Sequence, residues 1–483
     1  MLKKIRFFAY KTQTQAKYDT CNKIVPLNKF EQFLKDNLKN NIFAVDRYKE
    51  NLSTCRKLNG VEQYKEYKKL LRTTKNKLQT ELNDSLKSQN FFSENEERNN
   101  QVTNFLSNLH DNISPDTEKK SDIIVLHYCL KETHLNIILT TSYRSKGYQL
   151  VINKENLYKN IFRFKKQLVD KNEDLSLAKE LYRQIFSPVA EDIESIKPKI
   201  IMLSLDDTLR YIPMGALHDG KNFLAQKYMF ALYYNNYSSI YFIKPKNPWT
   251  ISAMGVSKQL TTNENVPFPA LPYVPQELNQ IVCDTRQIKR NNSCIFDGHI
   301  WLDNEFTLTT LIDNILDNDS TEIPPVLHIA SHFHIAPIIW EKSYLLLGDA
   351  DTLTLKKIEE EESYKFNKID LLTLSACNTA SVSSQRNTSI NSRQLNGIEI
   401  DSFALLLFKR NAKSVIGTLW KVNDESTSVF MQEFYNTYKL NEGRITKIQA
   451  LQESQIKFIS KKTKSKFSHP HYWAPFILFG NWR

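Results

Sequence analysis

Short apolar runs alternate with amphipathic stretches through most of this chain, and this alternation constrains its fold more than any other feature. From residue 123 onward, compact apolar segments such as 199–204, 326–331 and 414–418 are separated by stretches with helical spacing, such as 154–169. Strands that alternate with helices form βαβ units with parallel strands. We therefore predict an α/β fold, a mainly parallel sheet flanked by helices. The remaining predicted strands are 123–128, 135–141, 148–152, 251–256, 293–296 and 369–375, and the remaining predicted helices are 174–186, 276–283, 305–316, 355–364, 401–409, 426–438 and 446–460.

The first 121 residues differ from the rest, because they are polar and show only helical patterns. Apolar residues recur at helical spacing over 27–38 and 61–88, which predicts amphipathic helices. The stretch 93–120 has the pattern of a weak helix followed by a linker. We place a domain boundary here, with a helical N-terminal region at 1–121 and a second region at 122–483.

The positive charge of the chain is concentrated in the same N-terminal region. The net charge is +12, and residues 1–90 hold 20 Lys and Arg against 9 Asp and Glu, which accounts for +11 of it. A surface of this kind can meet nucleic acid, anionic lipid or an acidic regulatory protein. The plainer alternative is a solvated helical face rich in lysine.

The cysteines and the apolar runs bear on the cellular compartment. Six cysteines are scattered without any Cys-x-x-Cys spacing, so we predict neither a disulfide framework nor a zinc ribbon. A reducing compartment fits this pattern. The apolar core near the N-terminus is too short for a signal peptide, and no run reaches the roughly 18 residues of a membrane span. We expect a soluble, cytoplasmic protein.

Two apolar runs end in reactive side chains. One run, 326–331, is followed by His332, and the other, 369–375, is followed by Cys377. Sites in open α/β sheets gather at the carboxyl ends of the strands, and the intervening chain is long enough for a crossover between neighbouring parallel strands. The spacing therefore permits a dyad in which His332 is the base for a Cys377 nucleophile.

The same residues allow plainer interpretations. Buried cysteine is common in strands, and His328 and His332 can be hydrogen-bonded core residues. The three histidines at 328, 332 and 334 also resemble a metal cluster. Histidines four residues apart converge on a helix, however, whereas this segment has the pattern of a strand followed by a turn.

Several segments, in order along the chain, resemble the CHAT peptidases, which are caspase-like cysteine proteases related to separase. His-Ile-Ala-Ser-His-Phe at 328–333 is similar to the catalytic-histidine motif of that family, with His332 in the catalytic position. Asp-Leu-Leu-Thr-Leu-Ser-Ala-Cys-Asn-Thr at 370–379 is similar to the nucleophile motif, with Cys377 as the nucleophile. Further resemblances fall at 123–128, 181–188, 209–218, 411–424 and 472–482.

The resemblance implies a caspase-hemoglobinase-like fold with a leading part at 122–250 and a catalytic part at 251–483. It implies a cysteine endopeptidase that cleaves a protein substrate under the control of a partner or ligand and needs neither a cofactor nor a metal. The backbone N–H groups of Phe333 and Cys377 are its implied oxyanion donors. Many relatives carry glycine where Phe333 stands.

Acidic residues near the cleft of relatives are candidates for binding a basic P1 side chain of the substrate. By resemblance to separases this role falls first to Asp424, with Glu399 and Asp401 in reserve; the alternative for Asp424 is an N-cap of the following helix. The segment 381–396 lacks the usual glycines of the family. A catalytically inactive signalling module is therefore one alternative function, and a peptidase switched by nucleic acid at the basic N-terminal helices is another.

Overall fold

The structure is a computed structural model that describes residues 96–113, 122–286, 294–314, 324–334, 342–375, 398–441, 444–460 and 466–483. The basic segment 1–90 and the helices predicted over 27–38 and 61–88 lie outside the described residues. The helix predicted within 93–120 is present as α6 (Glu96–Ile113), and its Phe105 packs on the rings of Tyr233 and Tyr241. The division of the chain near residue 121 stays a prediction.

Twelve strands form one sheet in the order β3-β2-β1-β4-β5-β17-β16-β15-β11-β6-β10-β9. Their bounds are β1 (Ile123–Leu130), β2 (His134–Thr140), β3 (Ser145–Val151), β4 (Ile200–Ser204), β5 (Met229–Leu232), β6 (Ile251–Gly255), β9 (Val282–Asp284), β10 (Phe296–Leu302), β11 (Val326–Ala330), β15 (Leu371–Leu374), β16 (Ser414–Thr418) and β17 (Phe476–Gly480). Two small sheets contain β12 (Phe333–His334), β13 (Tyr344–Leu346) and β14 (Thr352–Thr354), and β7 (Leu260–Thr261) with β8 (Pro267–Phe268).

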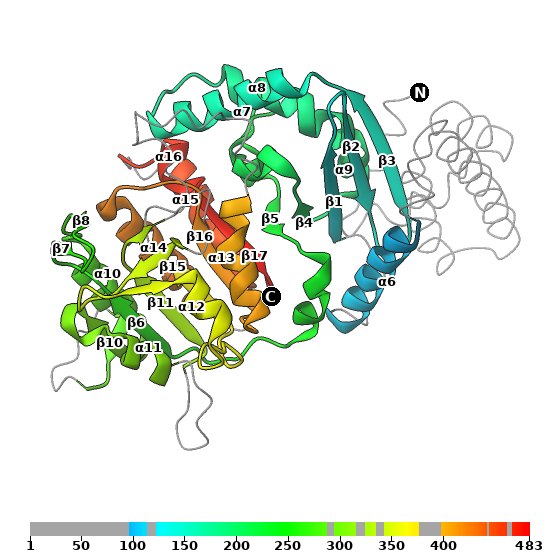
Figure 1. Ribbon diagram of the computed structural model, residues 1–483. Helices are drawn as coiled ribbons and strands as arrows, with labels where there is room; N and C mark the ends of the chain where they lie inside the picture. Colours follow the sequence, from blue (N-terminus) through cyan, green and yellow to red (C-terminus); the bar gives the residue numbers. More distant parts are fainter. Residues whose placement is uncertain are drawn as a thin grey trace, which may run out of the picture.

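The last strand joins the two parallel halves of the large sheet. Strand β17 pairs in parallel with β5 on one side and antiparallel with β16 on the other, and Figure 1 shows it in the middle of the molecule. Away from this seam, all neighbours are parallel except β1 with β2 and β2 with β3. The predicted fold class, a mainly parallel sheet flanked by helices, is confirmed.

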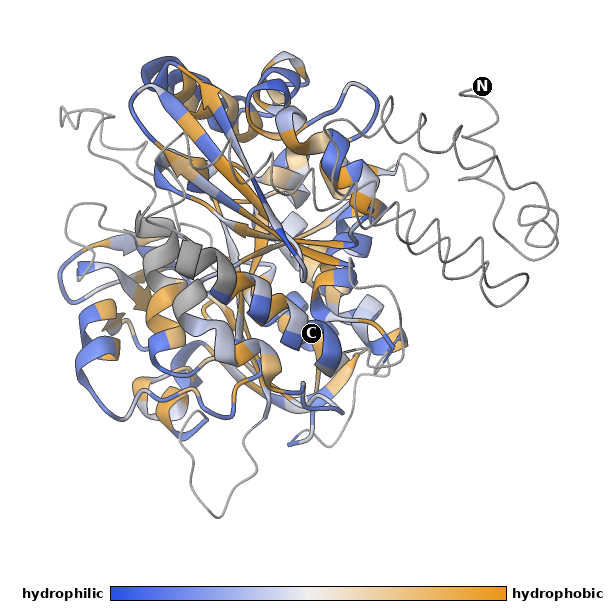
Figure 2. Cartoon of the chain, turned by 90° about the vertical axis from the view of Figure 1, so that its right-hand side faces the viewer, coloured by the Kyte–Doolittle hydropathy of each residue, from blue (hydrophilic) through white to orange (hydrophobic). Residues whose placement is uncertain are grey.

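Burial explains why the central strands could be recognised in the sequence. Every residue of β11, β15 and β16 is buried, and a strand that is covered on both faces has a continuous apolar sequence. The edge strand β3 carries Ser, Lys, Gly, Tyr and Gln and is only partly buried, as suits an unpaired edge. Figure 2 shows apolar residues along the inner strands and polar residues on the outer helices.

Helices cover the sheet. They are α7 (Lys154–Val169), α8 (Ser176–Leu181), α9 (Ser187–Ile196), α10 (Val274–Ile281), α11 (Leu308–Asp313), α12 (Leu355–Glu360), α13 (Ile398–Lys409), α14 (Asp424–Leu440), α15 (Lys447–Ile459) and α16 (Pro470–Trp473). The starts of α7 and α15 agree with the predictions because Asn153 and Thr446 cap them, each accepting a hydrogen bond from a backbone N–H of the first turn. Helix α14 packs on both α10 and α15.

One predicted strand was misplaced, and several strands of the large sheet were not predicted. The strand predicted at 293–296 begins only at Phe296 and continues as β10 to Leu302, through a sequence that contains Asp, Gly and His. Strands β5, β9 and β17 of the large sheet were not predicted, and all three are short.

One cysteine prediction is corrected by the structure. Cys283 in β9 and Cys294 before β10 form a disulfide, with their Cα atoms 5.1 Å apart, although their spacing gave no sign of pairing. Strand β10 pairs in parallel with β9, so the chain just before β10 lies beside β9. Cys294 therefore lies within disulfide distance of Cys283. This disulfide removes the cysteine-based argument for a reducing compartment. Among the helices that the structure describes, none has the length and apolar character needed to cross a membrane.

Candidate active site

The strands that lead to His332 and Cys377 are direct neighbours, an arrangement that the spacing in the sequence permitted. Strand β11 pairs in parallel with β15, and Ile329 lies opposite Leu374. Beyond the strand, the N–H of Ser375 still donates to the carbonyl of Ile329 over 2.8 Å. The chain therefore runs beside β11 up to the last described residue before the nucleophile candidate. Cys377 itself lies outside the described residues.

His332 is held in a defined orientation at the end of β11. It is 4% exposed, and its Nε2 donates to the carbonyl of Pro269 over 2.9 Å. The ring packs against Phe268, with centroids 5.0 Å apart, while the carbonyl of His332 accepts from the N–H of Leu346. The bond at Nε2 leaves Nδ1 as the ring nitrogen that can accept a proton, and no described residue hydrogen-bonds to Nδ1.

Electrostatics favour the neutral imidazole at His332. Burial lowers the pKa of His332 below its ordinary value, and the positive charge of Lys421 lowers it further, while the hydrogen bond to Pro269 opposes the shift. A neutral imidazole accepts a proton, so at neutral pH this ring is ready to act as a base.

His328 and His334 have other surroundings. His328 is fully buried, with Nε2 3.0 Å from the Oε1 of Glu277 and Nδ1 2.6 Å from the Oγ1 of Thr373. His334 stacks on Tyr344, with ring centroids 4.9 Å apart. Both nitrogens of His328 are engaged within the protein, so it does not share a metal ion with the other two histidines.

The backbone at Phe333 resolves the question raised by the missing glycine. Phe333 begins β12, opposite Leu345 of β13, and its side chain is buried. It is not among the described residues that take a positive φ, so a side chain at this position causes no backbone strain. The other implied oxyanion donor, the N–H of Cys377, lies outside the described residues.

Asp424 lies close to the segment that holds His332. Its Oδ2 accepts from the N–H of Tyr273 over 2.7 Å. Burial raises the pKa of Asp424 to about 6, the negative charge of Glu277 acts in the same direction, and the bond from Tyr273 opposes them. The alternative of an N-cap at Asp424 is wrong, because Asn423 is the N-cap of α14 and accepts from the N–H of Ser426.

The reserve candidates for substrate binding are placed only by their backbone. Glu399 and Asp401 lie in the first turn of α13 (Ile398–Lys409). Their side chains lie outside the described residues, so the structure does not relate them to His332.

A comparison with models of protein families identifies the family of this chain. The model described as the CHAT domain matches residues 175–481, which is more than half of the chain. This protein belongs to the CHAT-domain family. Among curated proteins, none matches the chain significantly.

Solved structures that resemble this CHAT protein are distant in sequence. Separase in the separase–securin complex of Saccharomyces cerevisiae is 10% identical with a TM-score of 0.47, and the match covers 97% of this chain but only 38% of the separase chain. Gingipain R, an Arg-specific cysteine proteinase, is 8% identical with a TM-score of 0.37, over 68% of this chain and 74% of its own. The RgpB pro- and mature-domain complex of Porphyromonas gingivalis matches at 8% identity and a TM-score of 0.37, over 68% of this chain and 76% of its own.

The segment 269–273 is the part of the site that sequence reasoning missed. It carries the carbonyl acceptor for His332 and the N–H donor for Asp424, and it runs directly into α10. Its sequence, Pro-Ala-Leu-Pro-Tyr, precedes a predicted helix, so a rigid entry to α10 could have been predicted. The contact of this segment with His332 could not have been predicted, because it joins residues that are 63 apart in the sequence.

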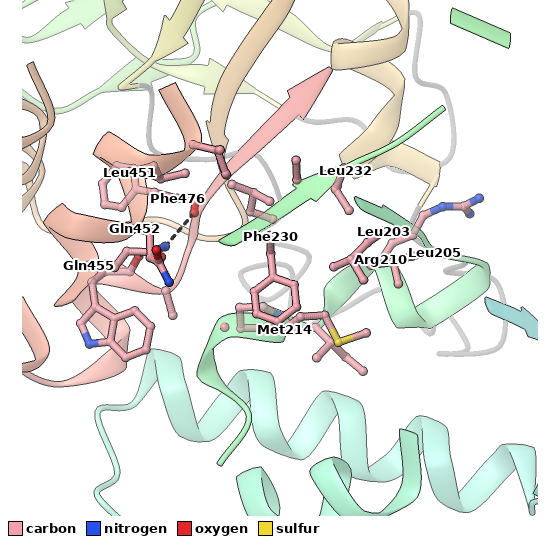
Figure 3. A pocket seen from close by; sticks show the side chains of 18 residues that line it. Leu203, Leu205, Arg210, Met214, Phe230, Leu232, Leu451, Gln452, Gln455 and Phe476 are labelled. Atoms are coloured by element: carbon pink, nitrogen blue, oxygen red, sulfur yellow. Dashed lines mark hydrogen bonds between the residues drawn. The ribbon is translucent and has the colours of Figure 1, made fainter. Parts of the chain in front are cut away.

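A cavity among the described residues lies elsewhere on the CHAT domain. It has a volume of about 40 Å³ and lies between β4, β5, the start of β17 and α15 (Figure 3). Its polar side chains are already engaged: Gln452 donates to the carbonyl of Ala225, and Gln455 to the carbonyls of Trp473 and Phe476. A space of this size holds only a few waters.

Proposed function

We propose that this CHAT protein is a cysteine endopeptidase with Cys377 as nucleophile and His332 as general base and acid. The observation that carries the proposal is the in-register parallel pairing of β11 with β15. In the sequence, His332 and Cys377 follow shortly after the carboxyl ends of these two neighbouring strands. Membership of the CHAT family supports the same assignment.

The proposed reaction needs only these residues and water. The Nδ1 of His332 takes the thiol proton, and the sulfur of Cys377 bonds to the scissile carbonyl carbon. The N–H groups of Phe333 and Cys377 stabilise the oxyanion. His332 then protonates the leaving amine as the C–N bond breaks, and a water activated by the same imidazole hydrolyses the thioester and releases the thiol.

For the substrate, we propose a basic P1 side chain, with Asp424 as its first partner and Glu399 and Asp401 as reserves. A carboxylate beside the residues that hold the catalytic histidine supports this choice, because Arg binds carboxylates in a bidentate way. We expect a peptide library to show cleavage after Arg or Lys. Cleavage after apolar residues that Asp424→Asn leaves unchanged would contradict the role of Asp424.

The mechanism is tested on single variants of the full chain. We expect Cys377→Ala and His332→Ala to abolish cleavage of a peptide library and labelling by a thiol-directed peptide probe, with unchanged folding by circular dichroism. Cys129→Ala is the matched control, because burial raises the pKa of this free thiol. Cleavage that survives in Cys377→Ala would contradict the mechanism. A folded wild type without any Cys377-dependent labelling would instead indicate the inactive binding module.

A further inference from the structure

A buried polar network lies beneath the two strands of the active site. It consists of Glu277 on α10, His328 on β11, Thr373 on β15 and Tyr435 on α14, all of them at most 1% exposed. The hydroxyl of Tyr435 lies 2.9 Å from the Oγ1 of Thr373 and 3.3 Å from the Nδ1 of His328. The Nε2 of His328 lies 3.0 Å from the Oε1 of Glu277, within hydrogen-bond distance. The proposed reaction uses none of these groups.

The network is aligned with the proposed dyad. His328 and Thr373 are register partners across β11 and β15. His332 follows His328 by four residues, and Cys377 follows Thr373 by four. A side-chain hydrogen bond between His328 and Thr373 therefore joins the two strands, four residues before each proposed reactive residue in the sequence.

The network also reaches the two helices that complete the site. Glu277 belongs to α10, which begins directly after the 269–273 segment whose Pro269 carbonyl accepts from His332. Tyr435 belongs to α14, whose first residue, Asp424, accepts from the N–H of Tyr273 in the same segment. The two helices are thus tied to the strands below the site and to each other at its edge.

We propose that this buried network is a positioning device, which fixes α10 and α14 on β11 and β15 so that Pro269 orients the imidazole of His332. The inference rests on the proposed function for its catalytic consequence, but the orientation of His332 is a structural property that can be measured separately. Glu277, His328, Thr373 and Tyr435 are positioning residues, since none of them touches the reacting atoms.

Two tyrosines on α14 provide a matched pair of variants. Tyr435→Phe removes a hydroxyl from the network. Tyr438→Phe removes a hydroxyl from the same helix, three residues on, where the side chain is equally buried but bonds to Asn247. We expect Tyr435→Phe to slow labelling of Cys377 by roughly tenfold, because small misplacements of a reacting group are costly, and Tyr438→Phe to leave the rate unchanged.

Thr373 tests the same point from the strand. Thr373→Val keeps the shape of the side chain and removes the hydroxyl, and we expect it to slow labelling as Tyr435→Phe does. Thr373→Ser restores a hydroxyl in the same place, and we expect it to restore the rate. A purely structural role would make both Thr373 variants equal in rate once they are folded.

The ring nitrogen resonances of His332, recorded on the full chain with ¹⁵N-labelled histidine, report its orientation without any need for activity. We expect them to shift in Tyr435→Phe and Thr373→Val, but not in Tyr438→Phe or Thr373→Ser. Unchanged His332 resonances and unchanged labelling in all four variants would overturn the positioning role. If wild type shows no labelling but the resonances shift only in the two network variants, the positioning role stands and the proposed function fails.

Discussion

Strand β15 passes two buried polar clusters that differ in what they can do. At its start, Asp370 pairs with Lys447 over 3.1 Å, and both side chains are fully buried. In its middle, Thr373 joins the network of His328, Glu277 and Tyr435. The first cluster is an ion pair at the start of β15, at the opposite end of the strands from His332. The second cluster connects both strands of the proposed dyad. Equal burial therefore does not imply an equal role: we expect the ion pair to set stability and the network to set the geometry of the site.

The ion pair should show the largest effect on stability. Lys447→Met leaves the carboxylate of Asp370 buried without its partner, and we expect a loss of about 3–5 kcal/mol in the free energy of unfolding, measured with urea. The double variant with Asp370→Leu should recover most of this loss. Labelling of Cys377 in the folded fraction should equal that of wild type. Slowed labelling there would contradict the division of roles.

The network should show a smaller loss of stability together with a loss of reactivity. Thr373→Val leaves His328 and Tyr435 each without one hydrogen bond, which costs about 1–3 kcal/mol for a buried group. Urea unfolding measures this loss, and probe labelling measures the reactivity. A stability loss as large as that of Lys447→Met, with normal labelling, would erase the distinction between the two clusters.

Stability and substrate binding should depend on pH through the protonation of Asp424. Its folded pKa of about 6 lies above its ordinary value of 3.8, so the ionised form is the less stable one in the fold. We expect Asp424→Asn to be at least as stable as wild type above pH 6, with the difference in the free energy of unfolding shrinking as the pH falls toward 3.8.

For peptides with a basic P1 residue, KM of wild type should rise as the pH falls through about 6. Thermal unfolding and KM profiles of the two proteins check these expectations, and an unchanged KM profile in Asp424→Asn would remove Asp424 from the P1 site.

An exposed ion pair should give the smallest effect and completes the comparison with Asp370–Lys447. Lys159 and Glu155 lie one turn apart on α7, with side chains 65% and 60% exposed. Lys159→Ala should change the free energy of unfolding by at most about 0.5 kcal/mol, because water screens such pairs. A urea titration beside Lys447→Met gives the contrast directly. A loss of several kcal/mol would show that burial is not what separates the two pairs.

The sequence was most informative where a strand is buried on both faces. The apolar runs at β6, β11, β15 and β16 predicted these strands within two residues at each end. The length of chain between β11 and β15 permitted the two strands to be neighbours, and they are. The helical spacing of apolar residues predicted α7 and α15 equally well. These features are local, so the sequence near each element contains them.

The site could be predicted only in part, because its supporting contacts join distant segments. The motif singled out His332, but nothing near it in the sequence pointed to Pro269 as its acceptor. The network depends on Glu277 and Tyr435, which lie 51 and 107 residues from His328 in the sequence. Which helix covers a strand is decided by the packing of the whole domain. The pairing of Cys283 with Cys294 spans only 11 residues, but it depends on the parallel pairing of β9 with β10, which was not predicted.

The rate at which a thiol-directed probe labels Cys377, measured against pH, tests the central claim most directly. If His332 and Cys377 form a dyad, labelling continues well below the ordinary cysteine pKa of about 8.5, slows strongly in His332→Ala and disappears in Cys377→Ala. Cys129→Ala leaves the profile unchanged. A wild-type profile that follows an ordinary thiol and is the same in His332→Ala would contradict the account.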